Sequence, residues 1–265
     1  MTPAAGNRRF RLAVCVLASG SKGNAIYVSD GQTAILIDAG LSGNEIVRRM
    51  KLKGLSAENL DAVLVTHEHS DHIQGVGVLS RKFALPVYMS QKAGNAIGSQ
   101  IGRIKDPIFF NSGESFLLKT LTIHPFSISH DAEDPAGFTI KQNGVKIGIA
   151  TDLGIATSMV KYHLKDCALL IVEANHDATM LMEGPYPWFI KQRIKGRTGH
   201  LSNADLRSLL EEVSHDRLTH VILAHLSEIN NTPQMAMETV KSALSRNNTR
   251  MIIAQQDRCS DIIHL

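Results

Sequence analysis

The sequence lacks the features that mark membrane, secreted and low-complexity proteins. No run of about 18 apolar residues occurs, so we expect no membrane-spanning helix. Residues 1–9 contain no apolar stretch ahead of a cleavage site, which argues against a secretory signal. The three cysteines lie far apart and form no Cys-x-x-Cys pair. A disulfide framework is therefore not expected, and a reducing cytoplasm is the natural setting.

Charge imbalance and linker-like composition are also absent. Lys and Arg number 28 against 25 Asp and Glu, and the net charge of +3 does not by itself indicate a nucleic-acid partner. No composition break or fixed-period repeat divides the 265 residues. The hydrophobic content of 43% is enough to bury a sizeable core. We expect a disordered segment over residues 1–9 and a single domain over residues 10–265.

Histidine stands out, with 12 residues, because three of them lie together. His67, His69, Asp71 and His72 form a His-x-His-x-Asp-His motif directly after the apolar strand predicted for residues 62–65. In an extended turn side chains alternate, so His67 and His69 point the same way. Asp71 and His72 are then free to serve a second, neighbouring metal ion. The alternative is a polar surface loop, which the strict spacing disfavours.

Further metal-ligand residue types follow other predicted strands. His130, Asp152 and His225 each lie at or just past a strand end, where α/β proteins gather their active-site residues. A carboxylate has two oxygens, so Asp152 is the candidate bridge between two ions. Asp38, at another strand end, is the candidate carboxylate that orients a ligand histidine through its second ring nitrogen.

The order of predicted elements indicates two sheets packed face to face with helices outside. Antiparallel strands come first, helices are interspersed, and Asn143-Gly144 is a strong hairpin signal. Together with the order of the ligand candidates, this pattern resembles the metallo-β-lactamase superfamily of binuclear hydrolases. The resemblance implies an α+β fold, a four-layer αββα sandwich, with two divalent metal ions between the sheet edges. It also implies a division of ligands, with one ion on His67, His69 and His130, the other on Asp71, His72 and His225, and Asp152 between them.

Four further segments narrow the resemblance. Residues 19–24, 173–177, 199–203 and 224–227 (SGSKGN, EANHD, GHLSN and AHLS) are together similar to motifs of the YycJ/WalJ-like family. That likeness implies a cytoplasmic bacterial enzyme with 5′-to-3′ exonuclease action on double-stranded DNA. In such a centre, two ions clamp the phosphodiester and a metal-bridging hydroxide attacks it. Mn²⁺, Zn²⁺ and Fe²⁺ all suit a His/Asp ligand set. Asp71, beside its ligand role, and His200 are the candidate catalytic residues.

His200 lies two residues before Ser202, the predicted cap of a helix that runs to residue 213. Helix N-termini bind anions, so His200, with Ser202 and Asn203, is a candidate to hold the scissile phosphate or to protonate the leaving oxygen. The alternative is a histidine that merely fixes the turn. His176 follows another strand end and either reaches the site or caps a loop.

Four cations precede His200 in residues 184–199, a segment that the sequence predicts to be irregular. If the segment were extended, Lys191, Arg193, Lys195 and Arg197 would share one face. Lys195 and Arg197 are then candidate contacts to a DNA backbone, which position a duplex without reading its sequence. A solvated surface is the equally simple alternative.

Three functions remain open from the sequence. The first is a metal-dependent DNA exonuclease. The second is a small-molecule phosphodiesterase or thioesterase of the same fold, which needs a closed pocket and no long basic track. The third is a metal-stabilised binding protein without turnover, which the complete set of ligand candidates makes the least favoured.

Overall fold

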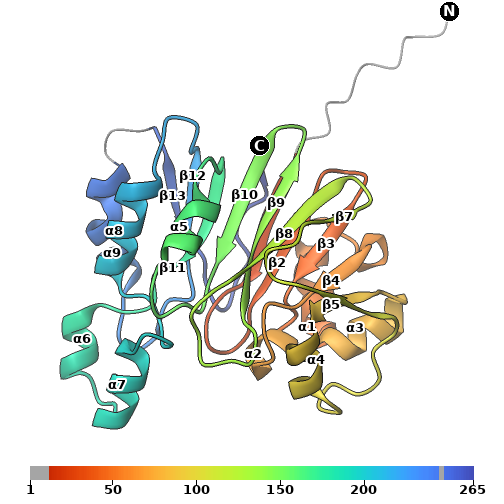
Figure 1. The fold of residues 1–265 in the computed structure, drawn as a ribbon, viewed down its shortest axis with the longest axis horizontal. Coiled ribbons are helices and arrows are strands. Elements are labelled where there is room, and N and C mark those ends of the chain that lie inside the picture. Colours follow the sequence, from red (N-terminus) through yellow and green to blue (C-terminus); the bar gives the residue numbers. More distant parts are fainter. Residues whose placement is uncertain (1–11, 245–247) are drawn as a thin grey trace, which may run out of the picture.

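The computed structural model describes residues 12–244 and 248–265, and the disorder expected for residues 1–9 lies outside them. Within the described residues the chain forms two seven-stranded sheets (Figure 1). Each sheet combines antiparallel and parallel strands. The two sheets therefore share one plan, in which parallel strands point their carboxyl ends toward a common edge of the molecule.

The first sheet has the order β14-β1-β2-β3-β4-β5-β6. Its antiparallel strands are β14 (Ile263–His264), β1 (Ala13–Ala18), β2 (Ala25–Ser29) and β3 (Ala34–Ile37). Its remaining strands run parallel to β3 and are β4 (Ala62–Leu64), β5 (Val87–Ser90) and β6 (Pro107–Phe110).

The second sheet has the order β13-β12-β11-β10-β9-β8-β7. Its antiparallel strands are β7 (Phe116–Leu118), β8 (Leu121–Ser127), β9 (Ala136–Gln142) and β10 (Val145–Ala150). Parallel to β10 run β11 (Leu169–Glu173), β12 (His220–Ala224) and β13 (Arg250–Ile253). The predicted hairpin turn is confirmed: Asn143 and Gly144 join β9 to β10 with φ of 48° and 81°, as a type I′ turn requires.

Helices cover the outer face of each sheet. Those around the first sheet are α1 (Gly43–Leu52), α2 (Ser70–Ile73), α3 (Val76–Phe83) and α4 (Gln91–Ile97), with a short 3₁₀ turn at Ala57–Asn59. Those around the second are α5 (Ser158–Leu164), α8 (Asn203–Val213) and α9 (Pro233–Lys241), with a 3₁₀ turn at Ser242–Leu244. Two further helices, α6 (Ala178–Glu183) and α7 (Trp188–Lys195), project below α8 and α9 in Figure 1.

Three apolar clusters separate four layers. Ile35 and Ile37 of β3 share the inner cluster with Ile140 of β9, so the two sheets bury their facing sides against each other. Ile46 of α1 belongs to a second cluster, outside the first sheet, and Leu209 of α8 to a third, outside the second sheet. Strands buried on both faces read as continuous apolar runs, as here. The predicted αββα sandwich is confirmed.

The prediction that residues 184–199 are irregular is wrong, because this segment contains helix α7. Pro187 occupies the N-cap of this helix, where proline is tolerated because the first backbone N–H groups have no helical partner. In a helix Lys191 and Lys195 share one side, and Arg193 turns to the other. The extended row of four cations therefore does not form. In the part of the chain described, no helix has the length and apolarity needed to cross a membrane.

Candidate metal centre

The turn after β4 that carries His67, His69, Asp71 and His72, here called the ligand turn, is held by backbone groups before β2 and after β3. Ala39 N donates to His72 O, and Asn24 N donates to Asp71 O, both at 2.8 Å. Gly40 packs so closely here that an added Cβ would lie 1.6 Å from the Asp71 carbonyl oxygen. No residue other than glycine fits this position. The backbone thus fixes where the Asp71 and His72 side chains begin.

Three site residues at strand ends hold a left-handed backbone. Asp38, Asp152 and His225 follow β3, β10 and β12 with φ of 59°, 58° and 54°. This conformation costs a residue with a Cβ roughly 1–2 kcal/mol, and such strain concentrates at functional sites. The sharp turn at each strand end aims the three side chains at one region between the sheet edges.

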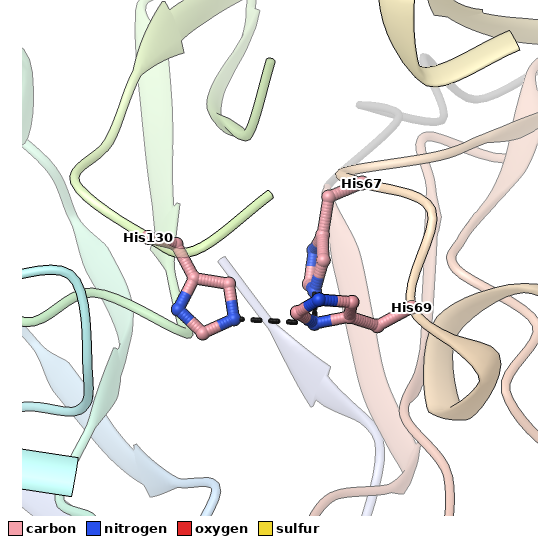
Figure 2. A group of neighbouring side chains, drawn as sticks. All are labelled: His67, His69 and His130. Carbon is pink, nitrogen blue, oxygen red and sulfur yellow. Dashed lines mark hydrogen bonds between the residues drawn. The ribbon is translucent and has the colours of Figure 1, made fainter. Parts of the chain in front are cut away.

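The first cluster consists of three imidazoles (Figure 2). Nδ1 of His69 lies 3.1 Å from Nε2 of His67 and 3.3 Å from Nε2 of His130. Two nitrogens bound to one Zn²⁺ at about 2.0–2.1 Å in tetrahedral geometry lie about 3.3 Å apart. The three nitrogens therefore already have the spacing of a metal site. His67 and His130 are buried and His69 is partly exposed, so the cluster opens to solvent on the His69 side.

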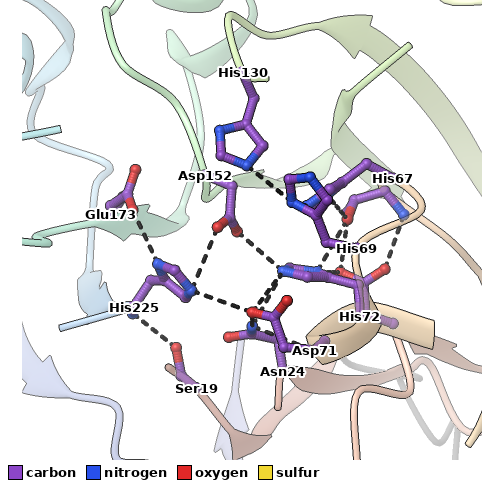
Figure 3. A network of polar contacts seen from close by, with 12 residues as sticks. Ser19, Asn24, His67, His69, Asp71, His72, His130, Asp152, Glu173 and His225 are labelled. Atoms are coloured by element: carbon purple, nitrogen blue, oxygen red, sulfur yellow. Dashed lines mark hydrogen bonds and ion pairs between the residues drawn. The ribbon is translucent and has the colours of Figure 1, made fainter. Parts of the chain in front are cut away.

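The second cluster combines two carboxylates with two imidazoles (Figure 3). Oδ2 of Asp71 lies 3.6 Å from Nε2 of His72 and 3.8 Å from Nε2 of His225. Asp152 faces the same two nitrogens with different oxygens, Oδ2 toward His72 and Oδ1 toward His225, each at 3.3 Å. His67 of the first cluster also lies within ligand range of Asp152 and His72. Asp152 thus stands between the two clusters, where a bridging carboxylate belongs.

The protonation preferences of the first cluster suit a metal ligand. Burial, followed by the positive charge of His72, holds the pKa of His67 well below its usual range. Burial also lowers the pKa of His130. Both imidazoles are therefore neutral near pH 7, and neutral imidazole is the form that binds metals.

The carboxylates of the second cluster favour positive charge at its two imidazoles. Burial alone would lower the pKa of His225, but the neighbouring carboxylates of Asp152, Asp71 and Glu173 raise it to about 10. Burial likewise opposes charge on His72, yet Asp38 and Asp152 raise its pKa well above the usual value. Two imidazolium protons carry the charge of one divalent ion. Exchanging them for such an ion keeps the charge of this buried site balanced.

Unpaired buried atoms provide an independent test of fit. Oδ2 of Asp152 and Nε2 of His225 are buried and make no hydrogen bond, although each has an ion-pair partner at 3.3 Å. Buried polar atoms without hydrogen bonds are rare in folded proteins and call for a partner such as an ion. Both atoms face the space between the clusters. The ligand set therefore fits two divalent ions.

Asp38 orients His72 from behind. Its Oδ2 accepts a hydrogen bond from Nδ1 of His72 at 2.7 Å, which leaves Nε2 facing the second cluster. The backbone N–H and the hydroxyl of Thr66 donate to Asp38 at 2.8 Å each and hold the carboxylate in place. Such carboxylate–histidine contacts fix the ring orientation and the tautomer of a metal ligand.

Sequence reasoning gave Asn24 only a minor place and missed its contact with the ligands. Its Oδ1 accepts from Gly20 N at 2.9 Å, which turns its Nδ2 toward Asp71 Oδ2 at 3.3 Å and His72 Nε2 at 3.1 Å. The loop of residues 19–24 is thereby tied to the second cluster. Its Gly-Asn sequence indicated a tight turn, but nothing in the sequence indicated this partner.

Glu173, at the end of β11, is the residue that sequence reasoning missed. Its side chain is fully buried, and its Oε1 lies 2.7 Å from Nδ1 of His200 and 3.0 Å from Nδ1 of His225. Backbone N–H groups of Leu153 and Leu201 donate to its Oε2. Burial opposes its charge, but His200 and His225 outweigh burial and lower its pKa to about 2. Its position at the end of an apolar strand and its place in the EANHD segment were the signals available in the sequence.

His200 lies at the mouth of the site. Its ring centroid is 5.3 Å from that of His130 and 5.2 Å from that of His225, and its side chain is 22% exposed. Burial works against its charge, but the Glu173 carboxylate raises its pKa above the usual value. The structure thus brings His200 to both metal clusters and leaves it open to solvent on one side.

Backbone N–H groups at the start of α8, behind His200, already donate hydrogen bonds within the protein. Asn203 N donates to His176 O at 2.9 Å, and Asp205 N donates to the Ser202 hydroxyl at 3.1 Å, which forms the predicted cap of α8. The Asn203 side chain is buried against Asn231 through two hydrogen bonds of 2.9 Å. His176 is 2% exposed, with its Nδ1 unpaired. Ser202, Asn203 and His176 therefore support the His200 loop from inside the fold.

One ion pair connects helix α7 to the first cluster. Arg193 binds Asp131 at 2.6 Å, and Asp131 lies 3.4 Å from Nε2 of the ligand His130. Lys195 and Arg197 are exposed, and the backbone oxygen of Arg197 accepts a bond from Ser129. Lys195 and Arg197 are thus surface charges that do not form one row with Arg193.

Known proteins resemble this chain in sequence and in fold. The family described as "Beta-lactamase superfamily domain" matches residues 33–226. Exodeoxyribonuclease YycJ of Bacillus anthracis is 39% identical over 231 residues, which is 86% of this chain and 88% of that protein. Exodeoxyribonuclease WalJ of Streptococcus pneumoniae is 34% identical over 235 residues, 87% of each.

The chain belongs to the metallo-β-lactamase superfamily. Within it, the chain is a member of the YycJ/WalJ-like family. Among solved structures, the metallo-β-lactamase fold protein YhfI of Bacillus subtilis matches 94% of this chain and 99% of its own with a TM-score of 0.70 at 18% identity, a likeness of fold. With the metal-ligand clusters in place, this superfamily member is a metal-dependent hydrolase.

Proposed function

We propose that the chain is a binuclear metal-dependent exonuclease that removes nucleotides from the 5′ end of double-stranded DNA in the cytoplasm. The observation that carries the proposal is the likeness to two exodeoxyribonucleases over some 86–87% of the chain. That span takes in every ligand of the two clusters, together with Glu173 and His200.

The two proposed ions would sit on the clusters already described, with Asp152 between them. His67, His69 and His130 would hold one, and Asp71, His72 and His225 the other. When bound, Mn²⁺, Zn²⁺ or Fe²⁺ ions would activate water and neutralise charge on the phosphate oxygens. A largely buried set of imidazoles and carboxylates is suited to hold such ions.

His200 is the proposed proton donor to the leaving oxygen. Its Nδ1 faces Glu173 at 2.7 Å, so the carboxylate stabilises the imidazolium and fixes the ring. The second ring nitrogen then carries the proton that a substrate can take. Glu173 is fully buried while His200 is partly exposed, so the carboxylate positions and His200 contacts the substrate. General acid catalysis of this kind contributes about 10²–10⁴-fold.

Digestion of a linear duplex, labelled at either the 5′ or the 3′ end and supplied with Mn²⁺, tests the proposal. We expect early release of the 5′ label as a short product and progressive shortening of the strand that carries the 3′ label. A chelated sample and the double variant Asp71→Asn/His72→Ala are the controls, and both should leave the duplex intact. Intact DNA in the presence of bound metal would reject the proposal, and hydrolysis of a panel of model esters would then identify a small-molecule phosphodiesterase or thioesterase.

A further inference from the structure

The outer face of the second sheet carries a groove that the metal centre does not account for. It consists of three hollows beside α5, of about 400, 370 and 510 Å³. The first and second are both lined by His163, and the second and third by Lys141 and Lys146, so the three hollows are neighbours along the sheet. We call the three together the outer groove.

One end of the outer groove reaches the metal centre. Ser129 lines the first hollow, directly precedes the ligand His130, and donates to the backbone oxygen of Arg197. From there the groove follows β8 toward Thr122, away from the site. At about 3.4 Å per residue of strand, residues 122–129 span roughly 24 Å. A duplex rises 3.4 Å per base pair, so the groove is about seven base pairs long.

The far half of the outer groove gathers positive charge. Lys141, Lys146 and Lys165 line the second hollow, and Asp166 is the one acidic residue among its lining. Asp166 already pairs with Arg217 at 3.2 Å. The chain as a whole has a net charge of only +3, so three lysines around one hollow are a concentration of charge.

Two of these lysines oppose each other in the sheet register. Lys141 of β9 is the cross-strand partner of Lys146 of β10, and Thr122 of β8 is the next partner in the same row. Like charges placed directly opposite destabilise a sheet. Lys146 is partly buried, and its Nζ donates to the backbone oxygen of Lys165 at 2.6 Å, which gathers the lysines further. A bound anion would relieve this repulsion.

The polar groups between the metal centre and the lysines match a phosphate backbone. Hydroxyl side chains line both hollows, from Ser127, Ser129 and Thr157 near the site to Thr122 and Thr139 near the lysines. His124, within the second hollow, has a buried Nε2 without a hydrogen-bond partner. Lys, Ser and Thr side chains supply many of the contacts that proteins make to phosphate oxygens.

We propose that the outer groove binds the phosphate backbone of the DNA duplex downstream of the end held at the metal centre, with Lys141, Lys146 and Lys165 as its far anchor. This inference rests on the proposed exonuclease function. It assigns to the second sheet a role in holding a long substrate, separate from the hydrolysis itself. Contacts of this kind carry no sequence preference and weaken with salt.

The test compares two double variants of the full chain, both loaded with metal. Lys141→Gln/Lys165→Gln removes two exposed anchors, while Lys146 keeps its bond to the Lys165 backbone. Lys51→Gln/Lys92→Gln is the matched control, because it removes two exposed lysines from α1 and α4 on the first sheet. The substrates are DNA hairpins with a blunt 5′ end and a stem of 5 or 20 base pairs, together with bis(4-nitrophenyl) phosphate.

For the 20-base-pair stem, we expect the groove variant to raise KM several-fold and to reduce the slope of log(1/KM) against log[salt] by about 1.8, or 0.9 for each lost contact. The 5-base-pair stem is too short to reach the lysines, so its KM should match that of the wild type. Hydrolysis of bis(4-nitrophenyl) phosphate and metal content should be unchanged in both variants.

Three results would overturn the inference in different ways. Equal KM and salt slope in the groove variant and the control, with digestion intact, would reject the outer groove alone. Hydrolysis of bis(4-nitrophenyl) phosphate without release of nucleotides from either hairpin by the wild type would reject the exonuclease function and the groove with it. Binding of a free mononucleotide as tight as that of the long hairpin, lost in the groove variant, would instead identify a small-ligand site.

Discussion

Glu173 and His200 form the contact that links the buried interior of the site to its open side. Oε1 of the fully buried carboxylate lies 2.7 Å from Nδ1 of the partly exposed imidazole. The same oxygen contacts Nδ1 of His225, a ligand of the second cluster. One carboxylate therefore orients both a metal ligand and the proposed proton donor, and a change at this position affects both.

Replacing Glu173 with glutamine keeps its size and removes its charge. Glu173 raises the pKa of His200, so without that charge His200 loses its proton at lower pH. We expect Glu173→Gln to lower kcat about 10–100-fold and to move the alkaline limb of the kcat–pH profile to lower pH. Profiles of wild type and variant over the same pH range check this. An unchanged alkaline limb would show that His200 does not donate the proton.

Removal of the His200 imidazole separates catalysis from metal binding. His200→Ala should retain the metal content of the wild type and lose about 10²–10⁴-fold in kcat. His264→Ala, an exposed histidine on β14, is the control and should keep full activity. Parallel loss of metal and turnover in His200→Ala would assign the residue a structural role.

Asp38 acts on the second cluster through His72. Asp38→Asn weakens the hold on the His72 ring, and we expect about 10–100-fold lower affinity for one of the two ions. Competition with a chromogenic chelator measures the affinity of each ion in turn. The ion on the three-histidine cluster should be released as from the wild type. Equal weakening of both ions would contradict a role confined to His72.

Gly40 tests the clamp on the ligand turn. A Cβ at this position meets the backbone of Asp71 at 1.6 Å, so Gly40→Ala must displace the turn. We expect a loss of roughly 3 kcal/mol or more in unfolding free energy, together with weaker metal binding. Gly54→Ala is the control, because Gly54 has φ of +70° but open space around it. Similar urea midpoints for the two variants would show that the turn gives way to the added Cβ at little cost, and would reject the clash at Gly40.

The sequence was sufficient for the layered fold and for the clustering of the ligand candidates. The apolar runs and the order of the predicted elements predicted the two sheets, and the spacing of His67, His69, Asp71 and His72 predicted two neighbouring ligand groups. Metal ligation imposes short spacings and strand-end positions, and both are visible in a linear sequence.

Contacts between distant residues could not be predicted in this way. Glu173 contacts His200, 27 positions away in the sequence, and His225, 52 positions away. A single glutamate at the end of a strand forms no short-range motif from which either partner could be predicted. Helix α7 was missed within the segment predicted to be irregular, where Pro187 occupies the N-cap of the helix. The outer groove depends on the cross-strand register of Lys141 and Lys146, which only the folded sheet reveals.

Metal stoichiometry is the most direct test of the binuclear centre. Inductively coupled plasma mass spectrometry on purified, metal-saturated chains should give two ions in the wild type and one in His130→Ala, which loses a ligand of the three-histidine cluster alone. His225→Ala should also retain one ion, held by the other cluster. A single ion in the wild type, or complete loss of metal in both variants, would contradict two separable sites joined by Asp152.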